Sequence, residues 1–213
     1  DRKTVSIFVE RDGSVSARVP QSLTDVEIAE VLKRKEYQIF KNISEWTLLN
    51  DAKKNREFVN GQSFLYLGRN YRLKMVSDDR KDVRFYKGYF ELPKGEVKNA
   101  ALRFKEFYKS QLLEKLKAPL QTYSLRLGLE PNEVKVMELQ NRWASCSEKG
   151  TVSFHWKCAM APIDVIGYIV AHELTHLEHP NHTSRFWNKL DKIYPNYQKQ
   201  QEWLRNYGAG MDL

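Results

Sequence analysis

Four of the five histidines of this chain lie in the segment 171–182, which reads A-H-E-L-T-H-L-E-H-P-N-H. His172 and His176 are four residues apart, so in a helix their side chains lie one turn apart on the same face. Glu173 follows the first of them directly. In this H-E-x-x-H pattern two imidazoles bind one zinc ion, and the carboxylate acts on water at the metal. These residue types predict metal-assisted hydrolysis, with Glu173 as the general base.

The end of this helix decides which further residues can reach the metal. In a continuous helix His179 would lie on the same face as His172, but roughly 10 Å along the axis. Two ligands of one ion cannot span that distance. Pro180 disfavours helical geometry at the residue before it. We therefore expect the helix to end near Glu178 or His179.

A catalytic zinc ion usually takes three protein ligands and keeps a fourth position for water. Beyond the turn at Pro180, His182 can reach back towards the first two histidines. We therefore predict His172, His176 and His182 as the zinc ligands. His179, which is nearer in sequence, and Glu202, a distal carboxylate, remain the alternatives for the third ligand.

The composition is that of a folded, basic protein. A length of 213 residues suffices for one domain, or for a domain with a small annex. The 41% of hydrophobic residues exclude a disordered chain. No apolar run approaches the roughly 18 residues of a membrane span, and no signal peptide is visible, so we expect a cytoplasmic location. The net charge of +8 predicts nonspecific, salt-sensitive association with DNA.

The chain has two cysteines, Cys146 and Cys158. If 148–150 forms a hairpin turn, Cys146 faces a residue near Thr151 rather than Cys158. We therefore expect no disulfide, in keeping with a reducing compartment. A role of the cysteines as zinc ligands is the weaker alternative, because the histidines already suffice.

The elements that precede the zinc helix begin with strands. Alternating apolar residues on both sides of Asp12-Gly13 predict a hairpin over 5–19. Thr24 and Glu27 have the spacing of a capping box, which predicts a helix that starts there. Two more hairpins are expected in the next segment, one over 61–76 with its turn at 68–70 and one over 83–92 with its turn at 87–88.

From residue 97 the apolar period becomes helical and ends at Gly128, with Pro119 expected to kink or break the helix. The remaining expected elements are a strand at 134–139, a hairpin of 142–147 and 151–156, the zinc helix opened by Pro162, a helix capped by Thr183, and a last helix after Pro195. This order predicts an α+β fold with the zinc helix packed on a small sheet. We expect a β-rich N-terminal region at 1–95 with a helical insertion, and the zinc-binding domain at 96–213.

With these residues in view, the chain resembles the YgjP-like metallopeptidases, bacterial zincins related to the SprT/Spartan and WLM groups. The resemblance covers nearly the whole chain and is carried by Leu67-Gly68-x-x-Tyr71, Arg142-Trp143-Ala144-Ser145-Cys146-Ser147, Tyr168, His172-Glu173-Leu174-Thr175-His176-Leu177, Asn181-His182, Phe186-Trp187, Pro195 and Trp203-Leu204. Ala144 and His155 depart from the glycine and asparagine that are usual in the family. We expect His155 to be structural.

The resemblance implies a zincin-like fold and a zinc-dependent peptidase that acts on a peptide or protein substrate, with no membrane partner. Arg142 and Tyr168 are candidates for the donor that stabilises the oxyanion. The aromatic side chains near the site, Phe186, Trp187 and Trp203, are expected to belong to the core. Two other functions remain open. One is a nucleic-acid-associated module with a structural or silent zinc site, and the other is a metal-dependent hydrolase of non-peptide substrates.

Overall fold

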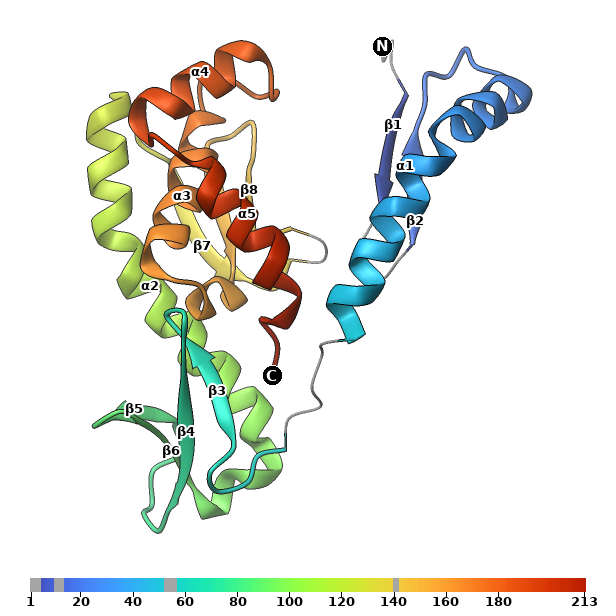
Figure 1. The fold of residues 1–213 in the computed structure, drawn as a ribbon. Helices are drawn as coiled ribbons and strands as arrows, with labels where there is room; N and C mark the ends of the chain where they lie inside the picture. The colour runs from blue at the N-terminus through green and yellow to red at the C-terminus, as the bar shows by residue number, and fades with distance from the viewer. Residues whose placement is uncertain (1–4, 10–13, 52–56, 140–141) are drawn as a thin grey trace. The chain divides into compact units, whose positions relative to one another are not determined.

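The computed structural model describes residues 5–9, 14–51, 57–139 and 142–213 (Figure 1). Contacts divide the chain into two compact units, 1–54 and 55–213. The domain boundary expected between residues 95 and 96 falls within the second unit. It stays a prediction of where one functional region ends and the next begins. Among the described residues no helix is both long enough and apolar enough to cross a membrane.

The first unit is a hairpin followed by a long helix. Its elements are β1 (Ser6–Val9), β2 (Val15–Arg18) and α1 (Asp25–Asp51). The strands pair antiparallel, as predicted, while the predicted turn residues Asp12-Gly13 lie outside the described residues. The capping box is confirmed, because the Thr24 N–H donates to Glu27 Oε2 (2.9 Å) and the Glu27 N–H donates to Thr24 Oγ1 (3.4 Å).

The second unit begins with a four-stranded sheet of order β3-β4-β6-β5. Its strands are β3 (Ser63–Tyr66), β4 (Arg69–Val76), β5 (Arg84–Tyr86) and β6 (Tyr89–Pro93). Both predicted hairpins form, but the first turn lies at Leu67-Gly68 and not at 68–70. Leu67 and Gly68 have φ of +48° and +78°, and Lys87 and Gly88 have +45° and +80°. These angles are those of two-residue type I′ turns, which match the twist of a hairpin.

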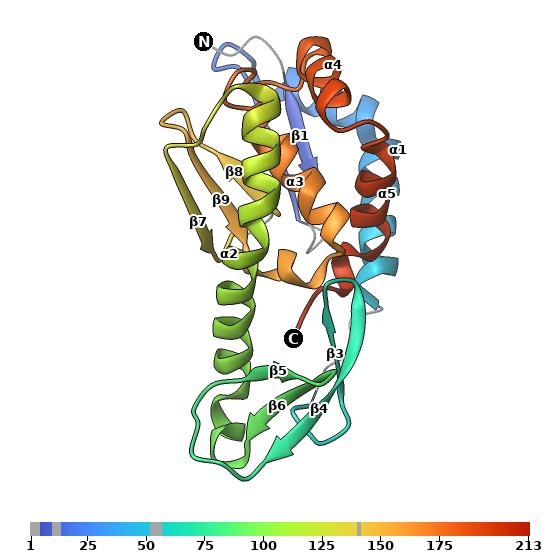
Figure 2. The ribbon, with the colours of Figure 1, turned by 90° about the vertical axis from the view of Figure 1, so that its left-hand side faces the viewer.

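A single long helix connects this sheet to the rest of the unit. After η1 (Lys94–Asn99), α2 (Ala100–Leu127) runs along both sheets of the unit (Figure 2). Pro119 lies inside α2 without interrupting it, so the predicted break is wrong. The proline ring removes one hydrogen bond, and the buried Leu112 and Leu116 hold the helix on the core. The helix ends at Gly128, as predicted, with φ of +69°.

The metal-site half contains a three-stranded sheet and three helices. The sheet has the order β7-β9-β8 and consists of β7 (Glu133–Met137), β8 (Ala144–Cys146) and β9 (Thr151–His155). It is followed by η2 (Trp156–Met160), α3 (Ile163–Thr175), α4 (Ser184–Ile193), α5 (Gln198–Tyr207) and η3 (Gly208–Gly210). Helix α3 contacts α2, α4, α5 and β8 (Figure 1). The predicted α+β class, with this helix against a small sheet, is confirmed.

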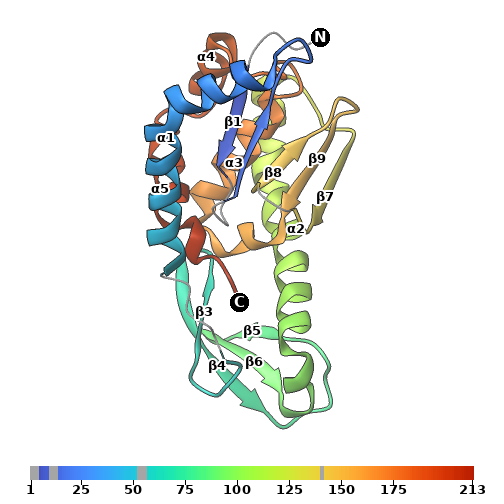
Figure 3. The same cartoon turned by 90° about the vertical axis from the view of Figure 1, so that its right-hand side faces the viewer.

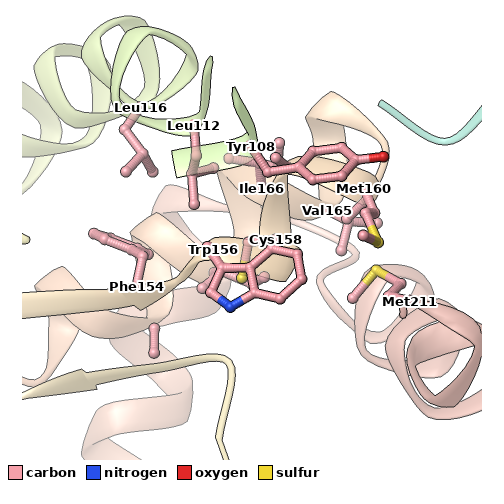
Figure 4. Packing of buried hydrophobic residues seen from close by; sticks show 14 of the residues in the cluster. Tyr108, Leu112, Leu116, Phe154, Trp156, Cys158, Met160, Val165, Ile166 and Met211 are labelled. Atoms are coloured by element: carbon pink, nitrogen blue, oxygen red, sulfur yellow. The ribbon is translucent and has the colours of Figure 1, made fainter. Parts of the chain in front are cut away.

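The core joins α2, η2 and α3 around Trp156 (Figure 4). The Trp156 Nε1–H donates to Glu138 Oε2 (2.9 Å), and Lys105 pairs with the same carboxylate. Partial burial raises the pKa of Glu138, but the hydrogen bonds from Lys105 and Trp156 outweigh it and lower the pKa to about 2. His155, expected to be structural, is buried with Nε2 3.2 Å from Glu138 Oε1.

The β3–β4 turn rests on the start of α3. The Leu67 and Gly68 N–H groups donate to the carbonyls of Ala159 (3.0 Å) and Met160 (2.8 Å) in η2. A Cβ atom on Gly68 would lie 2.7 Å from Pro162 Cγ. Pro162 is the N-cap residue of α3, so this close approach of backbone to ring positions the beginning of the helix.

Candidate metal centre

The H-E-x-x-H residues lie on α3, a helix whose surface is mostly apolar and buried. Ile166, Ile169, Val170 and Leu174 are buried, as their helical spacing predicts. The regular helix ends at Thr175, three to four residues before the predicted end. The chain then continues in tight turns, with the Glu178 and His179 N–H groups both donating to the Thr175 carbonyl (3.2 and 3.0 Å). His176 is the C-cap residue of α3 and has helical dihedral angles (φ −67°, ψ −19°).

Three imidazole nitrogens converge at the end of α3. His182 Nε2 lies 2.9 Å from His172 Nε2 and 3.1 Å from His176 Nε2. The three ligand atoms lie within 4.8 Å of one another. The structure therefore brings together the three histidines predicted as ligands, with His182 supplied by the loop before α4.

The donor set fits a zinc ion. Two nitrogens bound to a tetrahedral zinc, each about 2.0–2.1 Å from it, lie roughly 3.3 Å apart. The imidazole nitrogens would therefore need to move apart by only a few tenths of an ångström to bind the ion. His176 Nδ1 lies 3.0 Å from the His179 carbonyl oxygen. An Nδ1–H that donates to this carbonyl leaves Nε2 with its lone pair, the tautomer a metal ligand needs.

The alternative ligands do not join this cluster. The ring of His179 lies beside Glu178, 3.5 Å from its Oε1. Within the described part of the chain, His172, His176 and His182 form the one group of His, Cys, Asp and Glu side chains that converges closely enough to hold a metal ion. Glu202 therefore lies outside it.

The electrostatics keep the three imidazoles neutral. Burial, together with the neighbouring His176 and His182, lowers the pKa of His172 to about 3. Burial likewise lowers the pKa of His176 and of His182. His172 Nδ1 is buried and has no hydrogen-bond partner. Three neutral nitrogens that face one another repel unless a proton or a cation lies between them, so the arrangement favours a bound cation.

Glu173 of α3 is buried, with 7% of its surface exposed. Burial raises its pKa to about 8, and the positive charge of Arg142 opposes the rise. The same carboxylate raises the pKa of Cys146 and of Tyr168, in each case as a smaller effect than burial. Glu173 is thus electrostatically coupled to Arg142, Cys146 and Tyr168, and the Tyr168 hydroxyl stays protonated.

A layer of aromatic rings supports the imidazoles. Phe186 is fully buried, with its ring centroid 4.9, 4.5 and 4.7 Å from those of His172, His176 and His182. Trp187 stacks on His182 at 5.4 Å, and Tyr197 stacks on Trp187 at 5.4 Å. Phe186 belongs to the hydrophobic core, as predicted. Trp187 and Trp203 are partly buried and pack against this core. Tyr197 belongs to no motif in the sequence, so its place in this layer was not predicted.

Strand β8 is an edge strand of the three-stranded sheet and lies next to α3 (Figure 3). In the order β7-β9-β8, β8 has one neighbouring strand among the residues that the structure describes, and it contacts α3. The His155 N–H donates to the Trp143 carbonyl (2.7 Å) and the Ser147 N–H to the Thr151 carbonyl (2.9 Å). Because these directions alternate along an antiparallel pair, the backbone groups of Ala144 and Cys146 face away from β9.

Cys146 and Cys158 are not joined by a disulfide, as predicted. Cys146 is opposite Val152 in the β8–β9 register, one residue from the predicted neighbour. Cys158 is buried, and its thiol donates to the Trp143 carbonyl (3.3 Å).

Residues 3–207 match the protein family described as YgjP-like, metallopeptidase domain. None of the curated proteins matches the chain. Among solved structures, the metallopeptidase zymogen abylysin of Pyrococcus abyssi is similar to part of the chain. The two are 24% identical, the similarity covers 41% of this chain and 90% of abylysin, and the TM-score is 0.39.

Proposed function

Because the chain belongs to the YgjP-like metallopeptidase family, we propose that it is a zinc-dependent peptidase with Glu173 as its general base. The observation that carries this proposal is the convergence of the Nε2 atoms of His172, His176 and His182 beside a buried carboxyl group. A structural zinc site does not need a general base. Burial raises the pKa of Glu173, so keeping an ionised carboxylate there costs folding free energy that a purely structural site would gain nothing from. This argues for a catalytic site rather than a structural one.

His172, His176 and His182 would hold the zinc ion. When bound, the ion would polarise the scissile carbonyl, lower the pKa of the attacking water and favour the ionised form of Glu173. The Glu173 carboxylate takes up the proton of that water and delivers it to the leaving amide nitrogen. Tyr168, whose hydroxyl stays protonated, and Arg142 are the donors we propose for the oxyanion.

We propose that the substrate is an extended peptide segment that pairs with β8. The N–H and C=O groups of the buried Ala144 and of the partly exposed Cys146 face away from β9, which is the direction in which an added strand would pair. Hydrogen bonds to backbone alone do not select side chains, so this pairing suits protein substrates of varied sequence. The peptide would run past Glu173, because β8 contacts α3.

A cytoplasmic location remains part of the proposal and is supported by the two free cysteines. Association with DNA, which the net charge predicts, does not involve this site; the candidate surface for it is the four-stranded sheet.

The mechanism is tested by Glu173→Gln in the full chain, with Glu178→Gln as the matched control. Glu178 is the other acid near the histidines and pairs with Lys189 (2.8 Å). We expect the Glu173 variant to bind zinc as the unaltered chain does but to lose at least about a hundredfold in peptide hydrolysis, because the amide cannot accept a proton. The Glu178 variant should keep both properties. Undiminished turnover by Glu173→Gln refutes the mechanism.

A further inference from the structure

One face of the four-stranded sheet is covered by α2, and the opposite face is exposed over part of its area. Phe64, Phe90 and Leu73 point to the covered face, where Phe104 of α2 packs at ring-centroid distances of 4.4 Å from Phe64 and 5.2 Å from Phe90. Neighbours in the strand register share a face. On the opposite face, one row therefore crosses all four strands in the order Ser63, Arg72, Tyr89, Tyr86.

This open face combines exposed aromatic rings with cations. Tyr86 and Tyr89 are 45% and 46% exposed. The Arg84 guanidinium and the Lys87 ammonium lie 4.6 and 5.3 Å from the centroid of the Tyr86 ring. Arg72 and Lys74 are exposed, and neither has an ion-pair partner among the described residues. We call Arg72, Lys74, Tyr86, Lys87 and Tyr89 the tyrosine face.

The carboxylates around the tyrosine face leave its cations largely uncompensated. Glu91 is buried and pairs with Arg84 (2.6 Å) and Arg80 (3.5 Å). Asp78 pairs with Arg80 as well. The exposed Asp79 and Asp82 lie in the segment that leads to β5, so they limit the positive area on that side. What remains is a positive surface over β4 and the β5–β6 turn.

We propose that the tyrosine face binds single-stranded nucleic acid. Strands lie about 4.8 Å apart, so Arg72, Tyr89 and Tyr86 follow one another at that spacing, which suits bases that stack on the rings while the cations bind phosphates. A duplex keeps its base faces stacked inside and could use the cations only. An acidic protein would likewise use the charges without the rings. This binding is independent of the peptidase site, which lies at the end of α3 and in the loop before α4 and not on the four-stranded sheet.

The test uses the full chain and a labelled thymidine oligonucleotide of about 20 nucleotides, with binding followed by fluorescence anisotropy. We expect Tyr86→Ala and Tyr89→Ala each to weaken binding about fivefold or more, because each removes a stacking ring. Tyr86→Phe and Tyr89→Phe keep the ring and should keep the affinity. A plot of log affinity against log salt concentration has a negative slope. The double variant Arg72→Ala with Lys74→Ala should make this slope less steep by about 1.4, because two phosphate contacts are lost at about 0.7 each.

Matched controls come from α5, where Tyr207 is 59% exposed and Arg205 is exposed. Tyr207→Ala and Arg205→Ala should leave binding unchanged, and circular dichroism should show that every variant is folded. Three results would overturn the proposal: no binding at low salt, equal losses in the α5 controls, or competition by a duplex or by polyglutamate as effective as that by the oligonucleotide. Peptide hydrolysis by the tyrosine-face variants should equal that of the unaltered chain, so failure here leaves the peptidase proposal untouched.

Discussion

Gly68→Ala probes the contact between the β3–β4 turn and the active-site helix. Gly68 has φ of +78°, a conformation that side chains with a Cβ adopt at a cost of about 1–2 kcal/mol. The added Cβ would also lie 2.7 Å from Pro162 Cγ and 3.2 Å from Pro162 Cα. A proline ring and a backbone atom cannot rotate away, so the turn or the start of α3 must move.

Gly88→Ala separates these two costs. Gly88 occupies the same position in the β5–β6 turn, with φ of +80°, but its Cβ would meet no atom within 4 Å. We therefore expect Gly88→Ala to lower the free energy of unfolding by about 1–2 kcal/mol. Overpacking adds about 1–3 kcal/mol at Gly68, for a total of about 2–5 kcal/mol.

Urea unfolding of the two variants and the unaltered chain measures this difference. In thermal unfolding each kcal/mol corresponds to about 2–4 °C for a chain of this size. Equal destabilisation by Gly68→Ala and Gly88→Ala would refute the reasoning, because it would show that the turn does not press on Pro162. A smaller effect at Gly68 would refute it as well.

Two further predictions concern the ligands and acid stability. His182→Ala should lower zinc affinity sharply in a zinc titration, whereas His179→Ala and Glu202→Ala should leave it near normal; full affinity of the His182 variant would overturn the ligand assignment. The pKa of Glu138 falls from 4.5 to about 2 on folding, so its ionised form stabilises the chain above pH 4.5, and this stabilisation is lost as the pH falls towards 2. Unfolding free energies of Glu138→Gln and the unaltered chain should therefore differ at pH 6 and converge near pH 2, and a constant difference would contradict this account.

The sequence was most informative where a local pattern fixes the geometry. The spacing of His172 and His176 and the turn before Pro180 placed His182 correctly beside them. Gly128 gave the end of α2, because the left-handed conformation there favours glycine. The helix end at Thr175 was placed too late, since the tight turns that follow it still carry helix-like hydrogen bonds up to His179.

Features that depend on distant parts of the chain had no such signal. The parallel pairings of β4 with β6 and of β7 with β9 join segments that no turn connects, so local alternation could not predict them. The stacking of Tyr197 on Trp187 depends on the packing of α4 and α5. Phe186 was expected in the core, but its contact with all three imidazoles follows only from the way α4 packs on α3.

The length of α2 has a consequence for how the protein can be shortened. Its 28 residues extend over about 42 Å, and Phe104, Phe107 and Tyr108 in its first half are covered by the four-stranded sheet. A fragment that starts at residue 96 would keep all the histidines of the metal centre but would expose these three rings as one hydrophobic patch. Such a fragment is expected to aggregate, whereas one that starts at residue 57 keeps the sheet and should remain dispersed.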